Sequence, residues 1–169
     1  MQIIPSLNSG GAEQGTLDLA NYIADIEMKN LVVSNGGRML PYLKKDHVVH
    51  YKLPVHSKNF FKMPFVANQI NSIIKENRVN IVHVRSRAPA WLMTYINKDN
   101  LKTVSTFHNV YGRENFLKKI YNKKLANSDF IVAISKYVSE EIIKNYQIDP
   151  SKITVINRGI DTEFYNSDV

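Results

Sequence analysis

Short apolar runs alternate with amphipathic segments along the whole sequence. The apolar runs are rich in valine and isoleucine without strict polar alternation, which is typical of parallel strands covered on both faces. They predict strands over Gln2–Leu7, Leu31–Ser34, Val48–Leu53, Asn80–Val84, Thr103–Phe107, Phe130–Ile134 and Ile153–Ile156. The amphipathic segments predict helices over Ala12–Met28, Met39–Lys45, Pro64–Asn77, Pro89–Asn97, Glu114–Asn127 and Lys136–Tyr146. This order predicts an α/β fold built on a doubly wound parallel sheet.

Polar residues and glycines gather in the segments that directly follow the predicted strands. These segments are Asn8–Glu13, Asn35–Arg38, Arg85–Pro89, His108–Arg113, Ser135–Lys136 and Asn157–Asp161. Ser135 is also well placed to be the N-cap of the helix that follows it. Ligands of doubly wound sheets bind beyond the carboxyl ends of the strands. The pattern therefore predicts a single site along one edge of the sheet.

A glycine pair, Gly10 and Gly11, lies between the first predicted strand and the first predicted helix. Glycine lets the backbone approach a ligand closely, and a helix N-terminus offers free N–H groups to an anion. A phosphate-bearing ligand is one interpretation of this turn. The other interpretation is that the two glycines only make a tight turn.

Two histidines differ in their predicted surroundings. His83 lies inside the apolar run Ile81–Val84, which favours a core histidine with a satisfied hydrogen bond. His108 directly follows Thr103–Phe107, where a buried strand should reach the ligand edge. A histidine at that place can donate a hydrogen bond to a hydroxyl or phosphate oxygen. We therefore expect a functional role for His108 rather than for His83.

Several common chemistries lack their sequence signatures. The first turn lacks G-x-G-x-x-G and the second strand does not end in an acidic residue, which argues against a dinucleotide site. The sequence also lacks a P-loop and the G-x-S-x-G elbow of hydrolases. It has no cysteine, no H-E-x-x-H and no two aspartates separated by one residue. We therefore expect neither a disulfide nor a metal site.

Four motifs, in order, resemble the N-terminal half of retaining glycosyltransferases of family 4, above all bacterial enzymes of the lipopolysaccharide-core type. The motifs are Gly10–Glu13, His83–Trp91, Thr106–Gly112 and Val155–Asp161. The resemblance runs from the first strand to near the last residue. It implies one half of a GT-B architecture, in which two Rossmann-like domains face each other across a cleft.

The family moves a sugar from a nucleotide-sugar donor to an acceptor hydroxyl, retains the anomeric configuration and needs no metal or other cofactor. The resemblance implies that residues 1–169 form the acceptor-side domain, with a saccharide or a lipid-linked acceptor. The sequence ends where the family crosses into its donor-binding C-terminal domain. We therefore expect that second domain to be absent from this chain and the isolated domain to be inactive.

The resemblance also assigns roles to individual residues. His108 matches the position expected to touch the donor sugar near the bond that breaks, which makes it the candidate catalytic residue. Gly11 is expected to allow the closest backbone contact with the donor diphosphate. Asn109 is a departure, because relatives commonly have glycine after the histidine. Donor or acceptor binding is expected of Gly10, Gly11, Glu13, Arg38, Arg85, Arg87, Asn109 and Arg158. For the arginines, a surface or packing ion pair is the alternative.

The net charge of +7 suggests an anionic partner. His56–Phe65 mixes lysines with aromatic residues, and Arg113–Lys124 predicts a basic helix whose one face carries Phe116, Leu117, Ile120 and Tyr121. Such segments can lie on an anionic membrane. The alternative is that the apolar side chains pack on the sheet while the lysines are solvated. The sequence contains no recognised nucleic-acid module, so nucleic acid is not expected as a partner.

No apolar run approaches the roughly 20 residues that cross a bilayer, and no signal-peptide pattern is visible. The lack of cysteine fits a cytoplasmic protein. We therefore expect a cytoplasmic location, with contact at the inner face of the cytoplasmic membrane. The alternative function is a non-catalytic module that binds a glycolipid or another anionic ligand. The length of the native polypeptide separates these two functions.

Overall fold

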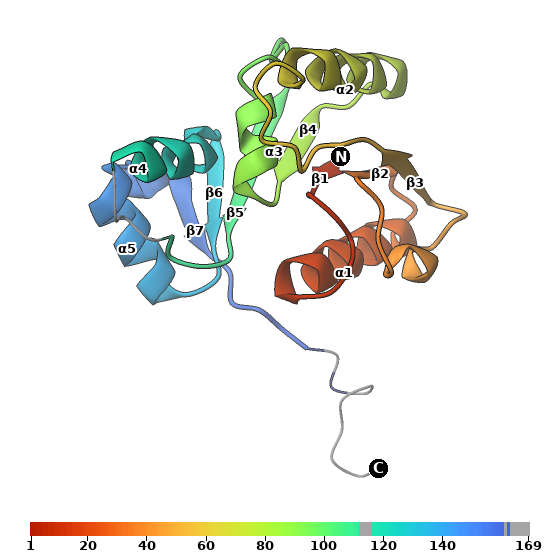
Figure 1. Ribbon diagram of the computed structural model, residues 1–169. Coiled ribbons are helices and arrows are strands. Elements are labelled where there is room, and N and C mark those ends of the chain that lie inside the picture. Colours follow the sequence, from red (N-terminus) through yellow and green to blue (C-terminus); the bar gives the residue numbers. More distant parts are fainter. Residues whose placement is uncertain (112–115, 161, 163–169) are drawn as a thin grey trace.

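The computed structural model describes residues 1–111, 116–160 and 162. Seven strands form one sheet in the order β3-β2-β1-β4-β5-β6-β7, and every neighbouring pair is parallel (Figure 1). The strands are β1 (Gln2–Ile3), β2 (Asn30–Ser34), β3 (Val48–Lys52), β4 (Ile81–Val84), β5 (Lys102–Phe107), β6 (Phe130–Ala133) and β7 (Ile153–Val155). The predicted doubly wound parallel sheet is confirmed.

Helices connect the strands and lie on both faces of the sheet. The helices are α1 (Gly11–Asp25), α2 (Met63–Asn77), α3 (Arg87–Leu92), α4 (Phe116–Lys123) and α5 (Lys136–Tyr146), with 3₁₀ turns η1 (Leu40–Tyr42), η2 (Lys124–Asn127) and η3 (Pro150–Lys152). The strand order reverses between β1 and β4, which makes their carboxyl ends the switch point where ligands of such sheets bind. In the part of the chain that the structure describes, no helix is long and apolar enough to span a bilayer.

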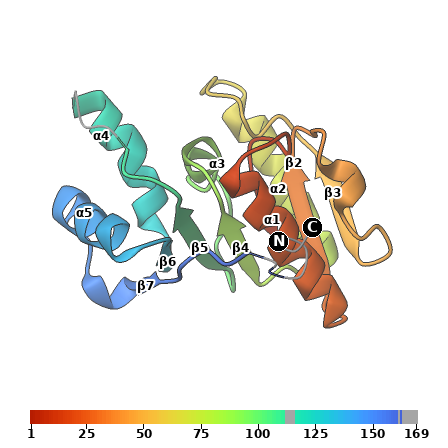
Figure 2. The ribbon, with the colours of Figure 1, turned by 90° about the horizontal axis from the view of Figure 1, so that it is seen from below.

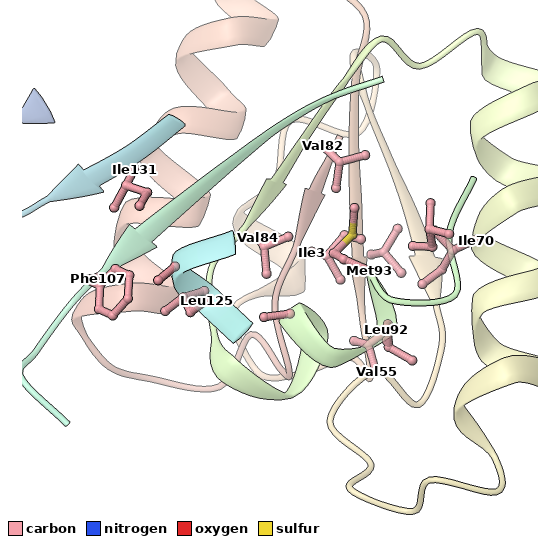
Figure 3. Packing of buried hydrophobic residues seen from close by; sticks show 14 of the residues in the cluster. Ile3, Val55, Ile70, Val82, Val84, Leu92, Met93, Phe107, Leu125 and Ile131 are labelled. Carbon is pink, nitrogen blue, oxygen red and sulfur yellow. The ribbon is translucent and has the colours of Figure 1, made fainter. Parts of the chain in front are cut away.

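Two hydrophobic clusters hold the layers together. The larger one joins the strand residues Ile3, Val82, Val84, Phe107 and Ile131 to Ile70 of α2, Leu92 of α3, Leu125 of η2 and Ile142 of α5 (Figure 3). The smaller one packs Leu17, Ala20 and Ala24 of α1 against Ile4, Val32 and Val48. Val32 and its neighbour Val33 belong to different clusters, because successive strand residues point to opposite faces. Both faces of the central strands are therefore buried.

Prolines shorten two of the predicted elements. β1 ends at Ile3, shortly before Pro5, which has no N–H for the strand ladder. The segment Met39–Lys45 forms only the 3₁₀ turn η1, which has Pro41 at its start. Since the residue before a proline is disfavoured in the α region, a regular helix does not begin there.

The other helices follow their predictions more closely. α5 has the predicted bounds, and the Ser135 hydroxyl caps it by accepting a hydrogen bond from the Val138 N–H at 3.2 Å. α3 is shorter than predicted and begins two residues before Pro89, which is tolerated in a first turn because the N–H groups there have no partner within the helix. The predicted helix Glu114–Asn127 is α4 followed by η2, and residues 114–115 lie outside the described part of the chain.

The loop after β2 packs directly on the chain that leaves β1. The Leu7 N–H donates to the Gly36 carbonyl at 2.8 Å, and the Met39 N–H donates to the Leu7 carbonyl at 2.7 Å. Gly37 has a φ of +151°, and a Cβ built on it would overlap the Leu7 carbonyl group. This close approach places the loop after β2 beside the turn after β1.

Candidate functional site

The turn between β1 and α1 is open to a ligand. Gly10 is the N-cap of α1 with a φ of +134°, and no side chain caps the first turn of the helix. A Cβ built on Gly11 would meet nothing within 4 Å, whereas one on Gly10 would collide with the Glu13 carboxylate. The space beside Gly11 at the start of α1 is therefore open, and the Glu13 carboxylate places a hydrogen-bond acceptor next to Gly10.

We expect the substitution Gly11→Val to separate the two interpretations of this turn. If the glycines only make a tight turn, the open space around Gly11 tolerates the side chain and ligand affinity is unchanged. If a phosphate-bearing ligand approaches the backbone, the side chain blocks it and the dissociation constant of the ligand rises by roughly tenfold or more, since about 1.4 kcal/mol is tenfold in affinity. The measurement is this dissociation constant for the full-length protein together with its thermal melting temperature, and the control is Tyr22→Val, at a residue of α1 that is 62% exposed.

His108 lies directly after β5, at the carboxyl edge of the sheet. Its Nδ1 is 3.3 Å from Nη1 of Arg158. A guanidinium group has only donors, so Nδ1 accepts this hydrogen bond and the ring proton lies on Nε2. The Nε2 atom is buried and has no hydrogen-bond partner among the described residues. His108 thus holds an unpaired N–H donor at the edge where a ligand is expected.

The surroundings of His108 keep it neutral. Burial, followed by the positive charges of Arg85 and Arg158, lowers the pKa of His108 to about 4. Burial and the charge of Arg158 likewise lower the pKa of Arg85 to about 10, while Asp18 acts in the opposite direction. Arg85 is only 6% exposed, and its Nε has no partner among the described residues. Arg85 and Arg158 therefore make the site positively charged, and Arg85 Nε and His108 Nε2 are donors without a hydrogen-bond partner among the described residues.

Arg158 joins the segment after β7 to the turn after β1. That segment runs from β7 past β5 and β4 toward α1 (Figure 2). Arg158 Nη2 donates to the Gly11 carbonyl, and its guanidinium group lies over Gly15 of α1. A Cβ on Gly15 would lie 2.9 Å from the central carbon of the guanidinium. Sequence reasoning missed Gly15, although a glycine inside a predicted helix is itself a signal of close packing.

His83 is a core histidine, as predicted. It lies on β4 and its Nε2 is 2.7 Å from the Thr106 hydroxyl on the neighbouring strand β5. Burial, and then the charges of Arg85 and His108, lowers the pKa of His83 to about 3.

We expect the stability of the protein to fall as the pH drops from 6.5 toward 4. His83 and His108 have lowered pKa values in the folded state, so the unfolded chain binds more protons in this range. The free energy of unfolding should change by up to about 1.4 kcal/mol per pH unit for a fully buried histidine. Denaturant melts at several pH values measure this slope. In His83→Gln the free energy of unfolding should depend less on pH than in the wild type. The control His47→Gln changes an exposed histidine and should keep the wild-type dependence.

Of the other predicted site residues, Arg38 joins the glycine turn and Asn109 makes only a local contact. Arg38 Nη2 is 3.3 Å from the Ser9 hydroxyl, and its backbone N–H donates to the Asn8 side chain at 3.3 Å. The Asn109 side chain accepts a hydrogen bond from the Val110 N–H at 2.7 Å. Three residues of the predicted post-strand segments, Gly112, Arg113 and Asp161, lie outside the described part of the chain.

Arg87 packs against a side-chain amide and two aromatic rings, contacts that differ from the ion pair given as the alternative for the arginines. Its Nη1 donates to the Asn122 side chain of α4 at 3.0 Å. Its guanidinium carbon lies 4.2 Å from the Tyr111 ring centre and 5.9 Å from the Tyr121 ring centre. These cation–π contacts tie the start of α3 to α4 rather than to the glycine turn.

The arrangement suits an anionic, hydroxyl-rich ligand. The free N–H groups of α1, the Arg85 guanidinium and the His108 Nε2–H are all donors, and the Glu13 carboxylate accepts hydrogen bonds from hydroxyls. Among the described residues, no three histidine, aspartate or glutamate side chains come together as a possible metal-ligand set.

Comparison with known proteins identifies the family. Residues 9–164 match the family described as Glycosyltransferase Family 4. This chain belongs to glycosyltransferase family 4. A search of curated protein sequences gives no match. The family match covers both the glycine turn and His108.

Solved structures share this fold. A glycosyltransferase from Rickettsia africae is 38% identical, with a TM-score of 0.83 over 98% of this chain and 44% of that protein. Anabaena HepE, solved in complex with UDP and glucose, is 16% identical with a TM-score of 0.76 over 97% of this chain and 45% of HepE. WaaG, a glycosyltransferase involved in lipopolysaccharide biosynthesis, is 13% identical with a TM-score of 0.68 over 96% of this chain and 45% of WaaG. The fold is thus the Rossmann-like α/β fold of GT-B glycosyltransferases, and this chain spans less than half of each matched protein.

Proposed function

We propose that this chain is the acceptor-side domain of a metal-independent, retaining glycosyltransferase. The reaction moves a sugar from a nucleotide-sugar donor to a saccharide or a lipid-linked acceptor. The observation that carries the proposal is the open glycine turn, which Arg158 joins to His108, together with two buried donors that have no hydrogen-bond partner among the described residues, Arg85 Nε and His108 Nε2. Buried polar groups are nearly always hydrogen-bonded, so these donors point to a ligand that completes the site.

Each residue has a role in this proposal. His108 donates its Nε2–H to the donor sugar near the bond that breaks, where negative charge develops on the leaving oxygen. The backbone at Gly10 and Gly11 approaches the donor diphosphate at the N-terminus of α1. Glu13 and Arg38 line the same turn on the acceptor side. Arg85 and Arg158 offset the negative charge of the bound ligand, and Arg158 holds the His108 ring.

The proposal includes a second, donor-binding domain that this chain does not contain. Each of the three matched structures above is more than twice as long as the part that this chain covers. The isolated domain is then expected to be inactive, because the nucleotide is held mainly by the other half. We place the protein in the cytoplasm at the inner face of the membrane, where a lipid-linked acceptor is reached.

The test is a transfer assay with the full-length protein. A set of nucleotide-sugars is supplied with a lipid or saccharide extract as acceptor, with and without EDTA. We expect sugar transfer that EDTA does not abolish, with the anomeric configuration retained in the product by NMR. Loss of activity with EDTA that is restored by a divalent cation, or an inverted product, would contradict the proposal.

A non-catalytic binding module is the second candidate, favoured by the number of positive groups at the site. It predicts a native polypeptide as long as this chain, which binds a glycolipid or another anionic ligand without turnover. Intact-mass measurement of the native protein distinguishes the two candidates. A mass near 19.4 kDa supports the binding module, and a mass about twice as large supports the transferase.

A further inference from the structure

Arg85 stands directly after β4, at the switch point of the sheet. Its backbone N–H donates to the Ile3 carbonyl at 3.0 Å, which holds it beside the end of β1. Because successive strand residues point to opposite faces, the Arg85 side chain shares the face of His83, two residues before it. His83 pairs in register with Gln2, whose side chain donates to the Thr16 carbonyl of α1 at 3.1 Å. The Arg85 side chain therefore lies on the face of the sheet that carries α1.

The charge of Arg85 is buried without a partner. The residue is 6% exposed, and its Nε atom has no hydrogen-bond partner among the described residues. No aspartate or glutamate in the described part of the chain forms an ion pair with it, and Asp18 acts on it only from the exposed side of α1. With a pKa of about 10, Arg85 is charged at neutral pH. Since a buried charge without a partner is strongly destabilising, an anionic group is needed to complete this place.

The neighbours of Arg85 lie farther along α1 than the glycine turn. The charges that act on Arg85 are those of Arg158 and Asp18. The guanidinium group of Arg158 lies over Gly15. Gly15 and Asp18 follow Gly11 by four and seven residues, which is roughly 6 and 10 Å along the helix axis. A diphosphate bound by the first N–H groups of α1 is therefore about one to two helical turns from these residues, and Arg85 is placed for a second anionic group.

We propose that Arg85 binds an anionic group of the acceptor, a phosphate or a carboxylate. A guanidinium group presents its N–H donors in a planar fork that matches two oxygens of either group. The charge of Arg85 also acts on His108, so an acceptor held by Arg85 lies beside the candidate catalytic residue. The acceptor is then an acidic saccharide, or a lipid-linked sugar that carries a phosphate. This inference deepens the proposed function and rests on it.

Replacing Arg85 by methionine tests the binding step without turnover. The probes are glucose 6-phosphate and glucuronate, titrated calorimetrically into the full-length protein with pyrophosphate present to fill the glycine turn. We expect Arg85→Met to raise the dissociation constant of at least one of these probes by roughly tenfold or more, because it removes a charge-assisted pair. Uncharged glucose should bind the wild type and the variant equally. The matched control Arg78→Met removes an exposed arginine at the end of α2 and should bind the probes as the wild type does.

The melting temperature of the same variants without ligand shows whether Arg85 has a structural role instead. Because its charge is buried without a partner, full-length Arg85→Met should melt at the same temperature as the wild type or at a higher one. A lower melting temperature would mean that an acidic group in the rest of the polypeptide pairs with Arg85, and it overturns the inference. An unchanged dissociation constant for both probes overturns it as well.

The transfer assay identifies the source of the anionic group. The acceptor extract is divided into an aqueous and an organic phase, and each phase is passed over an anion-exchange resin. We expect the wild type to use only acceptors that the resin retains, from the aqueous phase for an acidic saccharide and from the organic phase for a lipid phosphate. For these acceptors Arg85→Met should raise KM by roughly tenfold or more, while KM for the donor changes by less than about twofold.

The outcomes separate this inference from the proposed function. Transfer to acceptors that the resin does not retain, or an equal rise of both KM values in Arg85→Met, overturns the inference and leaves the proposed function standing. If no fraction accepts a sugar, the proposed function fails, and the calorimetric titration alone decides whether Arg85 binds an anionic group.

Discussion

Replacing His108 by alanine in the full-length protein should lower kcat for sugar transfer by roughly 10²- to 10³-fold, the usual effect of losing one preorganised donor to developing charge. The donor in question is the Nε2–H, which is buried and has no hydrogen-bond partner in the part of the chain that the structure describes. Since the ring is neutral well above its lowered pKa of about 4, the loss should be similar at pH 6 and pH 8. Steady-state kinetics at both pH values check this.

The control for His108 is the other buried histidine. His83→Gln changes a residue of the same sheet whose ring nitrogen is already paired with Thr106. We expect it to affect stability more than kcat. The ¹⁵N shifts of the His108 ring give an independent readout, because they report the tautomer with the proton on Nε2. An alanine variant with nearly normal kcat would remove His108 from the mechanism.

The hydrogen bond from Arg158 explains why His108 presents this particular donor. Neutral histidine exists in two tautomers, and the partner of one ring nitrogen decides which of them is populated. Arg158 occupies Nδ1, so only Nε2 can carry the proton. The same guanidinium contacts the Gly11 carbonyl, and the orientation of His108 is thereby tied to the glycine turn.

The sequence predicted the sheet and the edge that carries the candidate site because both follow from local patterns. Valine- and isoleucine-rich runs without alternation identify parallel strands, and in a parallel sheet the residues after each strand come to one edge. For the same reason the sequence predicted, without the structure, that Gly11 and His108 lie at this edge. Each stands directly after a strand or at the start of the helix that follows it.

The remaining features depend on contacts between distant segments. Arg158 meets Gly15 only because the segment after β7 passes back toward α1, and no local pattern specifies that path. Similarly, the periodicity of α4 predicted an apolar face but not what that face contacts. The buried residue of α4 is Asn122, which binds Arg87, and Tyr121 stacks on Trp91, whereas Phe116, Leu117 and Ile120 are exposed.

We expect Gly37→Ala to destabilise the protein by about 3 kcal/mol or more, the largest stability effect of an alanine substitution at any glycine that the structure describes. The new Cβ would overlap the Leu7 carbonyl and lie 2.8 Å from the Asn8 nitrogen, and backbone atoms cannot move aside as a flexible side chain can. The φ of +151° adds strain for any residue with a side chain. Backbone strain and overpacking each cost roughly 1–3 kcal/mol.

Gly36→Ala is the matched control for this prediction. Gly36 also has a positive φ, of +95°, but a Cβ there would lie 3.7 Å from the Lys52 side chain and 3.8 Å from that of Leu40, which is ordinary contact. Gly36→Ala should lower the free energy of unfolding through backbone strain alone, by about 1–3 kcal/mol. Denaturant melts measure the free energy of unfolding of both variants, and the difference between them reports the close approach between Gly37 and Leu7. Because that approach sets the loop carrying Arg38 beside the glycine turn, folded Gly37→Ala protein should also bind the donor more weakly than Gly36→Ala does. Equal stability of the two variants would contradict this prediction. It would show that the backbone at Leu7 moves to accommodate the new side chain, and that the turn after β1 is less rigid than its packing indicates.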